Sequence, residues 1–300
     1  MKREFDMLTF IFRWTIISIF ILTIVSFSRG EGYKMCGDNN PRWDDLTHWN
    51  LRDFHPFVEG NYGIGFLNHK RFDRDFENYG LLEVKLGYNH SVIHEDFVLF
   101  IDERYVMGSL SKKDQNWLDS EADTGKVRTE LLRFGFGNRS GYGYKLGFLS
   151  FLPFHQSQFS FTKLKTQRPI DLQPSDLEIL ERYGERYRFG LSTEGGIKLE
   201  LFESVAFTGS YEAGVIYPRV IFFRWLAGLA IETAIVEGIS HFARDIVDHS
   251  STLGPIFYAL LRNGAAYGIY VGWRDKMYWP INSETPLTYE TLKFGISITF

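Results

Sequence analysis

The sequence predicts an all-β fold: an antiparallel transmembrane β-barrel of eight strands, or ten if two ambiguous stretches are also strands, with a helical insertion. Three observations lead to this prediction. Segments of about ten residues, the length of a tilted strand that crosses a bilayer, alternate apolar and polar side chains. The polar faces are rich in Gly and carry isolated charges, as the crowded interior of a small barrel would. The apolar faces carry Tyr, Phe and Trp near segment ends, as an aromatic girdle at a membrane interface would.

The composition supports a β protein and excludes several other classes. The 300 residues include 28 Phe, 16 Tyr and 7 Trp against 28 Gly and 9 Pro, which is typical of strands and turns. One cysteine excludes an intramolecular disulfide framework. A net charge of -4 provides no basic field for a polyanion, so we expect no nucleic-acid partner. A mean hydropathy of -0.17 argues against a bundle of transmembrane helices.

The N-terminal residues have the layout of an export signal. Lys2 and Arg3 precede an apolar core from Trp14 to Val25, and small residues follow at Ser26 and Ser28. This arrangement predicts a signal peptide over residues 1–28. The alternative is an uncleaved anchor helix from about Leu8 to Phe27, a span that Arg13 interrupts. Both interpretations place the rest of the chain outside the cytoplasm.

Eight segments carry the alternation that predicts strands. They are residues 58–66, 81–89, 131–137, 141–148, 188–201, 204–217, 266–273 and 289–300. A turn is predicted at Asn138-Arg139-Ser140-Gly141, between the third segment and the fourth. The ambiguous stretches, 97–107 and 157–164, would raise the number to ten. A soluble β-sandwich is the competing fold, and the Gly-rich, charged polar faces argue against it.

The last segment ends in a pattern that points to a cellular compartment. Leu292, Phe294, Ile296, Ile298 and Phe300 occupy every second position up to the final residue. This resembles the C-terminal signature of bacterial outer-membrane β-barrel proteins, whose closing strand ends in an aromatic residue that the assembly machinery recognises. The resemblance concerns an architecture class and no specific family. It implies the outer membrane of a Gram-negative cell as the location, with outer-membrane lipid and the barrel assembly machinery as partners.

The resemblance also gives a domain organisation. A signal peptide at 1–28 is followed by an N-terminal periplasmic segment at 29–55 and by a barrel at 56–300 that contains a helical insertion at 219–263. Because both ends of such barrels normally lie in the periplasm, a strand at 266–273 places the insertion before it on the periplasmic side.

Three segments have helical rather than strand character. A short helix is predicted with Ser175 as N-cap and Gly184 as its stop. The second is a long run from Arg219 to Asp248, and the third a helix over residues 254–262 that ends at Asn263-Gly264.

The long run has the charge pattern of an amphipathic helix. Arg224, Glu232 and Glu237 would each be costly in hydrocarbon, which argues against a transmembrane helix. One interpretation is a helix that plugs or underlies the barrel, approaching another backbone through the small residues at 230, 234 and 238. The other is a helix that lies flat on the membrane surface.

The predicted inward faces are nearly balanced in charge. Five acids are set against six bases: Glu59, Glu83, Glu194, Glu200 and Glu212 against Lys85, Arg133, Lys145, Arg188, Lys198 and Lys293. An ion-selective channel is expected to have an excess of one sign, whereas a barrel filled by its own side chains needs paired charges. The balance therefore favours a plugged lumen over an open pore.

No motif in the sequence identifies a chemical site. His90 and His94 have a spacing that would place two imidazoles on one helical face, but no third ligand is evident, and a surface turn is the simpler interpretation. His241, Asp245 and His249 line up at spacing four, which predicts a solvated helix stripe. No serine has a neighbouring histidine motif that predicts a hydrolase. We therefore assign no catalytic, cofactor-binding or metal residue and expect no cofactor.

The function expected from these observations is that of an integral outer-membrane barrel with a structural, anchoring or small-solute transport role. The alternative is an outer-membrane barrel enzyme, a lipid or peptide hydrolase, suggested by the polar inward groups and the several histidines. A secreted β-sandwich binding module is a third hypothesis.

Overall fold

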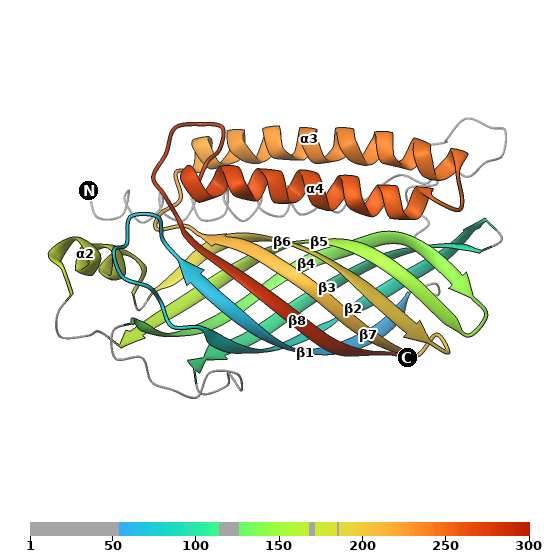
Figure 1. The fold of residues 1–300 in the computed structure, drawn as a ribbon, viewed down its shortest axis with the longest axis horizontal. Coiled ribbons are helices and arrows are strands. Elements are labelled where there is room, and N and C mark those ends of the chain that lie inside the picture. Colours follow the sequence, from blue (N-terminus) through green and yellow to red (C-terminus); the bar gives the residue numbers. More distant parts are fainter. Residues whose placement is uncertain (1–53, 96, 114–125, 168–171, 185) are drawn as a thin grey trace, which may run out of the picture. The chain divides into compact units, whose positions relative to one another are not determined.

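The computed structural model describes residues 54–300 except 96, 114–125, 168–171 and 185. Eight antiparallel strands form a closed barrel in which each strand pairs with its neighbours in sequence and β8 closes on β1 (Figure 1). The strands are β1 (His55–Asn68), β2 (Tyr79–Glu95), β3 (Val98–Lys112), β4 (Arg128–Leu146), β5 (Leu149–Gln167), β6 (Tyr187–Leu201), β7 (Val205–Ile216) and β8 (Leu287–Thr299). The predicted fold class is thus confirmed, with eight strands.

Short and long connections lie at opposite ends of the barrel. The connections at 96–97, 147–148 and 202–204 are short and lie at the end where β1 starts and β8 stops, which we call the turn end. The connections at 69–78, 113–127, 168–186 and 217–286 are long and join strand ends at the other end, which we call the loop end. Phe300 donates its backbone N–H to the carbonyl of Pro56 at 2.9 Å, which ties the last residue to the first strand.

Alternation along each strand separates two kinds of surface. Outward positions expose apolar side chains: Val84, Phe294 and Ile296 are 51%, 60% and 52% exposed. Inward positions carry polar and charged side chains that are buried, such as Glu59 and Lys85 at 0% exposure. The apolar side chains therefore point away from the barrel axis, the reverse of a soluble protein with an apolar core.

A helical hairpin packs on the outside of the barrel. It consists of α3 (Phe222–His249) and α4 (Gly254–Asp275), which contact each other, and α4 contacts strands β4 to β7 (Figure 1). The hairpin leaves and returns at the loop end, and its tip reaches the turn end, where Tyr144 donates to the carbonyl of Thr252 at 2.6 Å. At 28 residues, α3 is long and apolar enough to cross a membrane, judged by length and composition.

A compact apolar cluster closes the loop end. Helix α2 (Pro174–Tyr183) contributes Leu180 and Tyr183, which pack with Tyr79, Leu131 and Leu287 from the strand ends. The hydroxyl of Tyr183 accepts a hydrogen bond from the backbone N–H of Leu287 at 3.0 Å. Gly184 ends α2 as predicted, but the helix begins at Pro174 with Gln173 as N-cap, two residues before the predicted cap at Ser175.

Two predicted strand segments are in fact one strand. The predicted turn at 138–141 lies in the middle of the continuous strand β4, so that prediction was wrong. The two ambiguous stretches belong to β3 and β5. The Asn138-Arg139-Ser140-Gly141 run stays extended because Arg139 points into the barrel and bonds carboxylates there, while Ser140 bonds the hairpin outside.

The predicted strand at 266–273 was also wrong, because these residues belong to α4. The helix continues through Asn263-Gly264 to Asp275, so the helical insertion is longer than the predicted 219–263. Ala266, Ile269, Tyr270 and Trp273 form one buried helical face. As a result the hairpin joins the barrel at the loop end, opposite the two strand termini, and its predicted position on the side of the termini was wrong.

The long helix neither plugs the barrel nor uses its small residues for packing. The stripe of small residues at 230, 234 and 238 is exposed, and α3 instead buries Trp225, Leu229, Ala243 and Val247. The predicted signal peptide and residues 29–53 of the predicted N-terminal segment lie outside the described residues, and His55, the last residue of that segment, begins β1.

Candidate functional site: the interior charge network and the helix–wall seam

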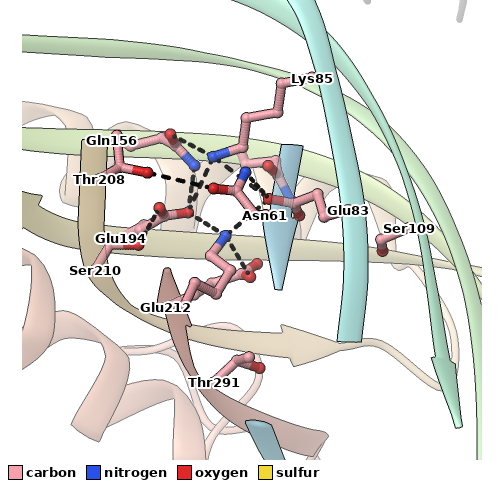
Figure 2. A network of polar contacts seen from close by, with 12 residues as sticks. Asn61, Glu83, Lys85, Ser109, Gln156, Glu194, Thr208, Ser210, Glu212 and Thr291 are labelled. Atoms are coloured by element: carbon pink, nitrogen blue, oxygen red, sulfur yellow. Dashed lines mark hydrogen bonds and ion pairs between the residues drawn. The ribbon is translucent and has the colours of Figure 1, made fainter. Parts of the chain in front are cut away.

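The barrel interior contains a continuous network of buried charges (Figure 2). Its ion pairs join five carboxylates with five cations: Glu59, Glu83, Glu103, Glu194 and Glu212 with Lys85, Arg133, Arg139, Lys198 and Lys293. These residues come from β1, β2, β3, β4, β6, β7 and β8, and Gln156 of β5 bonds into the same network. Every strand of the barrel therefore contributes a side chain to it.

Arg139 links opposite walls at one end of the network. Its guanidinium makes a bidentate contact with Glu59, with Nη1–Oε2 at 2.6 Å and Nη2–Oε1 at 2.8 Å, and a further Nη1 contact with Glu103 at 2.8 Å. Its Nε donates to Gln156 at 3.1 Å, and the group lies 4.4 Å from the ring centroid of Phe154. Planar forked contacts of this kind hold two carboxylates in a defined geometry.

Lys293 plays the same part toward the loop end. Its ammonium group lies 2.5 Å from Glu194, 3.1 Å from Glu83 and 3.1 Å from Glu212. Arg133 contacts Glu212 through both terminal nitrogens, at 3.0 and 3.3 Å. Each of these charges is satisfied by at least one opposite charge, as burial requires.

Most of the predicted inward charges meet in this network, and two members were missed. Glu59, Glu83, Glu194, Glu212, Lys85, Arg133, Lys198 and Lys293 were predicted to face inward and do. Glu200 is buried at 7% exposure as predicted but is not a member of the network. Lys145 lies instead at the turn end, where it pairs with Glu203, and Arg188 bonds backbone carbonyls at the loop end. Glu103 and Arg139 were missed because they lie in an ambiguous stretch and in a predicted turn.

A second polar region lies on the outer wall beneath α4, where β4, β5 and β6 carry polar and small residues in outward positions. We call it the helix–wall seam and define it by Ser140, His155, Ser157 and Gly195 on the wall and Arg262 and Asn263 on the helix. Arg262 donates from Nη1 to Ser140 Oγ at 3.0 Å and also bonds Tyr258. Helix and wall approach so closely that a Cβ on Gly195 would lie 2.7 Å from Asn263 Oδ1.

Within the seam, three side chains form a hydrogen-bonded chain. His155 Nδ1 lies 3.0 Å from Asn263 Oδ1, and His155 Nε2 lies 3.1 Å from Ser157 Oγ. Asn263 also donates from Nδ2 to the carbonyl of Phe154 at 3.0 Å. The imidazole is buried at 3% exposure. No sequence prediction assigned these residues, although Ser157 lies two positions after His155 and therefore on the same face of an extended strand.

The histidine patterns singled out in the sequence do not form sites. His90 belongs to strand β2, so its spacing from His94 is not helical. On α3, His241 is exposed and lies 3.8 Å from Asp245, so these side chains lie on the outer surface of the helix. Across the described part of the chain, no group of three or more His, Cys, Asp or Glu residues could hold a metal ion.

The architecture defines a class: a closed eight-stranded antiparallel barrel with an apolar outer wall and a charged interior. No family model and no curated protein sequence matches this chain. Among solved structures it is similar to Neisserial surface protein A, at 10% identity and a TM-score of 0.39 over 82% of this chain and 97% of that one. It is also similar to Ail, the attachment invasion locus protein of Yersinia pestis, at 6% identity and a TM-score of 0.30 over 83% of this chain and 99% of that one.

Proposed function

We propose that this chain is an integral outer-membrane barrel with a structural or anchoring role and a lumen that conducts no solute. The observation that carries the proposal is the polarity of the wall: apolar side chains such as Val84 and Phe294 face outward and are half exposed, while the charges are buried inside. Such a surface is stable against lipid and unstable against water.

The non-conducting lumen is supported by the interior network. Arg139 and Lys293 reach across the barrel to carboxylates on other strands, and each is buried at 1% exposure or less. An ion entering this space would have to break contacts of 2.5 to 3.1 Å between buried charges, which costs several kcal/mol. An ion-selective channel is also expected to have an excess of one charge sign, and in this network five carboxylates face five cations.

The connection lengths support one orientation in the membrane. Barrels of this class have short periplasmic turns and longer external loops. The turn end, with both strand termini, then faces the periplasm, and the loop end with α2 and the root of the hairpin faces outward. Outer-membrane lipid is the expected partner of the outer wall that the hairpin does not cover, and the barrel assembly machinery is the expected partner of β8.

Membrane integration is tested by extraction and by electrophoresis. The protein is expected to stay in the outer-membrane fraction after a carbonate wash. In detergent it is expected to migrate faster unboiled than boiled, because the closed barrel stays folded. A protein that washes off and migrates alike in both states refutes membrane integration.

Orientation is tested by thiol labelling of intact cells in a Cys36→Ser background. Arg71→Cys at the loop end is expected to react with a membrane-impermeant maleimide, whereas Glu203→Cys at the turn end is expected to react only after lysis. Both positions are exposed, so accessibility to solvent is matched. The reverse labelling pattern contradicts the proposed orientation.

The closed lumen is tested in planar bilayers. Purified protein is expected to produce no conductance steps, with insertion verified by the heat-modifiable band in proteoliposomes from the same preparation. Reproducible single-channel steps from an inserted sample would overturn the non-conducting form and favour the solute-transport role.

A further inference from the structure

The polar residues of the helix–wall seam lie where a membrane barrel normally presents hydrocarbon side chains. Outward positions elsewhere on the same strands are Phe134, Phe136 and Phe159, yet at the seam they are Ser140, His155 and Ser157. Hydrogen bonds between polar side chains can hold a helix against such a wall, and those of Arg262 and Asn263 do so. The bond between His155 and Ser157 lies within β5 and joins nothing to the helix, so helix packing does not explain it.

The hydrogen bonds of the seam define the protonation state of His155. Asn263 donates from Nδ2 to the carbonyl of Phe154, which turns its Oδ1 toward the ring. An amide oxygen only accepts, so Nδ1 of His155 carries the hydrogen and donates to it. In the neutral imidazole Nε2 then carries the lone pair and faces Ser157 Oγ at 3.1 Å, so the serine hydroxyl donates to it.

This is the arrangement of an activated serine. A nucleophile and a base within hydrogen-bond reach, with the base oriented by a third group, form the geometric pattern of nucleophilic catalysis on unrelated folds. Burial of His155 and partial exposure of Ser157 place the base out of solvent and the nucleophile at the surface. We propose that Ser157, His155 and Asn263 form a hydrolase site for the acyl esters of membrane lipids.

The chemistry balances with water as the second substrate. Ser157 Oγ attacks the ester carbonyl carbon while its proton passes to His155 Nε2. The tetrahedral intermediate collapses, the alcohol leaves with that proton, and the acyl group stays on Ser157. Water then attacks the acyl carbonyl, gives its proton to Nε2, and the carboxylic acid leaves as the proton returns to Oγ. Asn263 acts through His155 and is a positioning residue.

One polar side chain next to Ser157 is the candidate donor to the negative oxygen of the intermediate. Asn138 is the cross-strand partner of Ser157 on the same outer face, and paired Cβ atoms lie about 5 Å apart, within reach of its amide.

The position of the site determines the substrate class. Ser157 opens onto the outer wall and not into the charged interior, so the ester must arrive laterally from the surroundings of the barrel. Aromatic side chains of Phe136 and Phe159 stack next to it at 5.4 Å between centroids and provide an apolar surface for an acyl chain. The lipid assignment rests on the proposed membrane position, whereas the triad itself does not.

The test uses the full chain in detergent and three substrates. Hydrolysis of p-nitrophenyl butyrate, a soluble ester, measures the activity of the triad without a membrane. Phospholipid vesicles and lipopolysaccharide are the two possible lipid substrates, and release of free fatty acid measures the hydrolysis of each. A fluorophosphonate probe with peptide mapping identifies any activated serine. We expect the probe to label Ser157 and fatty acid to be released from one of the lipids.

The variants separate catalysis from packing. Ser157→Ala is expected to lower hydrolysis at least about 10³-fold. Ser160→Ala is the matched control on the same strand. The Oγ of Ser160 faces the interior and has no hydrogen-bond partner in the described part of the chain, so this variant is expected to leave hydrolysis unchanged. Asn263→Ala is expected to lower kcat about 10²-fold or more at unchanged KM, because it affects only the orientation of the base.

The outcomes decide the proposal even if a variant fails to fold. Absence of a probe adduct on Ser157 in the folded wild-type protein overturns it, as does hydrolysis that Ser157→Ala retains in full. If the probe labels Ser157 and the soluble ester is hydrolysed but neither lipid is, the proposed triad is supported and the lipid substrate is overturned. Unboiled samples of each variant must retain the faster-migrating band, which tests the barrel separately from the site.

Discussion

Replacement of Arg139 by Met tests whether the interior network stabilises the barrel through charge pairing. Methionine keeps an unbranched apolar stem against Phe154 but removes three charged contacts, at 2.6, 2.8 and 2.8 Å, and the hydrogen bond to Gln156. Glu59 keeps Lys85 at 3.3 Å and Glu103 keeps Lys198 at 2.5 Å. One buried carboxylate charge in the network is nevertheless left without a compensating cation.

The expected loss is about 3–5 kcal/mol of unfolding free energy, the usual result when one partner of a buried pair is removed. It is measured by urea unfolding of the protein in lipid vesicles, followed by tryptophan fluorescence. Lys70→Met is the control, because its 2.7 Å pair with Asp275 is exposed and should contribute no more than about 1 kcal/mol. Adding Glu59→Gln to Arg139→Met should recover part of the loss. A cost below about 1 kcal/mol for Arg139→Met, or no recovery in the double variant, would refute this reasoning.

Three further measurements test other parts of the structure. Val84→Arg places a charge on the apolar outer wall and should lower the free energy of unfolding by about 2–4 kcal/mol in the same urea experiment if this position lies near the bilayer midplane. The loss should be close to zero if the wall faces water. Burial, together with the charges of Arg71 and Arg182, lowers the pKa of His69 at the loop end, so protonation of this side chain favours the unfolded chain. The free energy of unfolding should therefore fall as the pH drops below about 6.5, and His69→Gln should weaken this pH dependence. Gly295→Ala brings a Cβ to 1.8 Å from Asn61 Oδ1 and should cost about 1–3 kcal/mol, since the interior has no room; a neutral variant would mean that the lumen is less filled than described.

Strands with an apolar outward side and a charged inward side were predictable because the period of two is unambiguous there. β1, β2, β6, β7 and β8 all carry it, and β8 ends in five alternate apolar residues. β4 was divided because Asn138-Arg139-Ser140-Gly141 has the composition of a turn. Its extended conformation is stabilised by partners that are distant in sequence: Glu59 for Arg139 and Arg262 for Ser140.

The segment 266–273 shows how two periods can coexist in one stretch. Its alternation of large and small residues fits a strand, yet Ala266, Ile269, Tyr270 and Trp273 also lie at helical spacing, and that face is the buried one. Packing against the barrel wall decided between the two.

The seam could be predicted only in part. The two-residue spacing of His155 and Ser157 was visible in the sequence and gained meaning only once the strand and its outward face were known. Asn263 had no local signal, because it lies 108 positions after His155 within a predicted helix end. Its amide bonds the wall, and the helix continues past it.

The hairpin between β7 and β8 imposes an order on assembly. Ile216 and Leu287 are direct partners in the sheet although residues 217–286 separate them, and closing so long a connection carries an entropic cost that grows with its length. If α3 and α4 associate first, the two ends of the connection are brought together before β8 pairs. In the proposed membrane barrel, the polar wall under α4 would be costly against hydrocarbon, so we expect the helices to cover it before or while the barrel enters the bilayer. We therefore expect β8 to pair last, after α3 and α4 have associated.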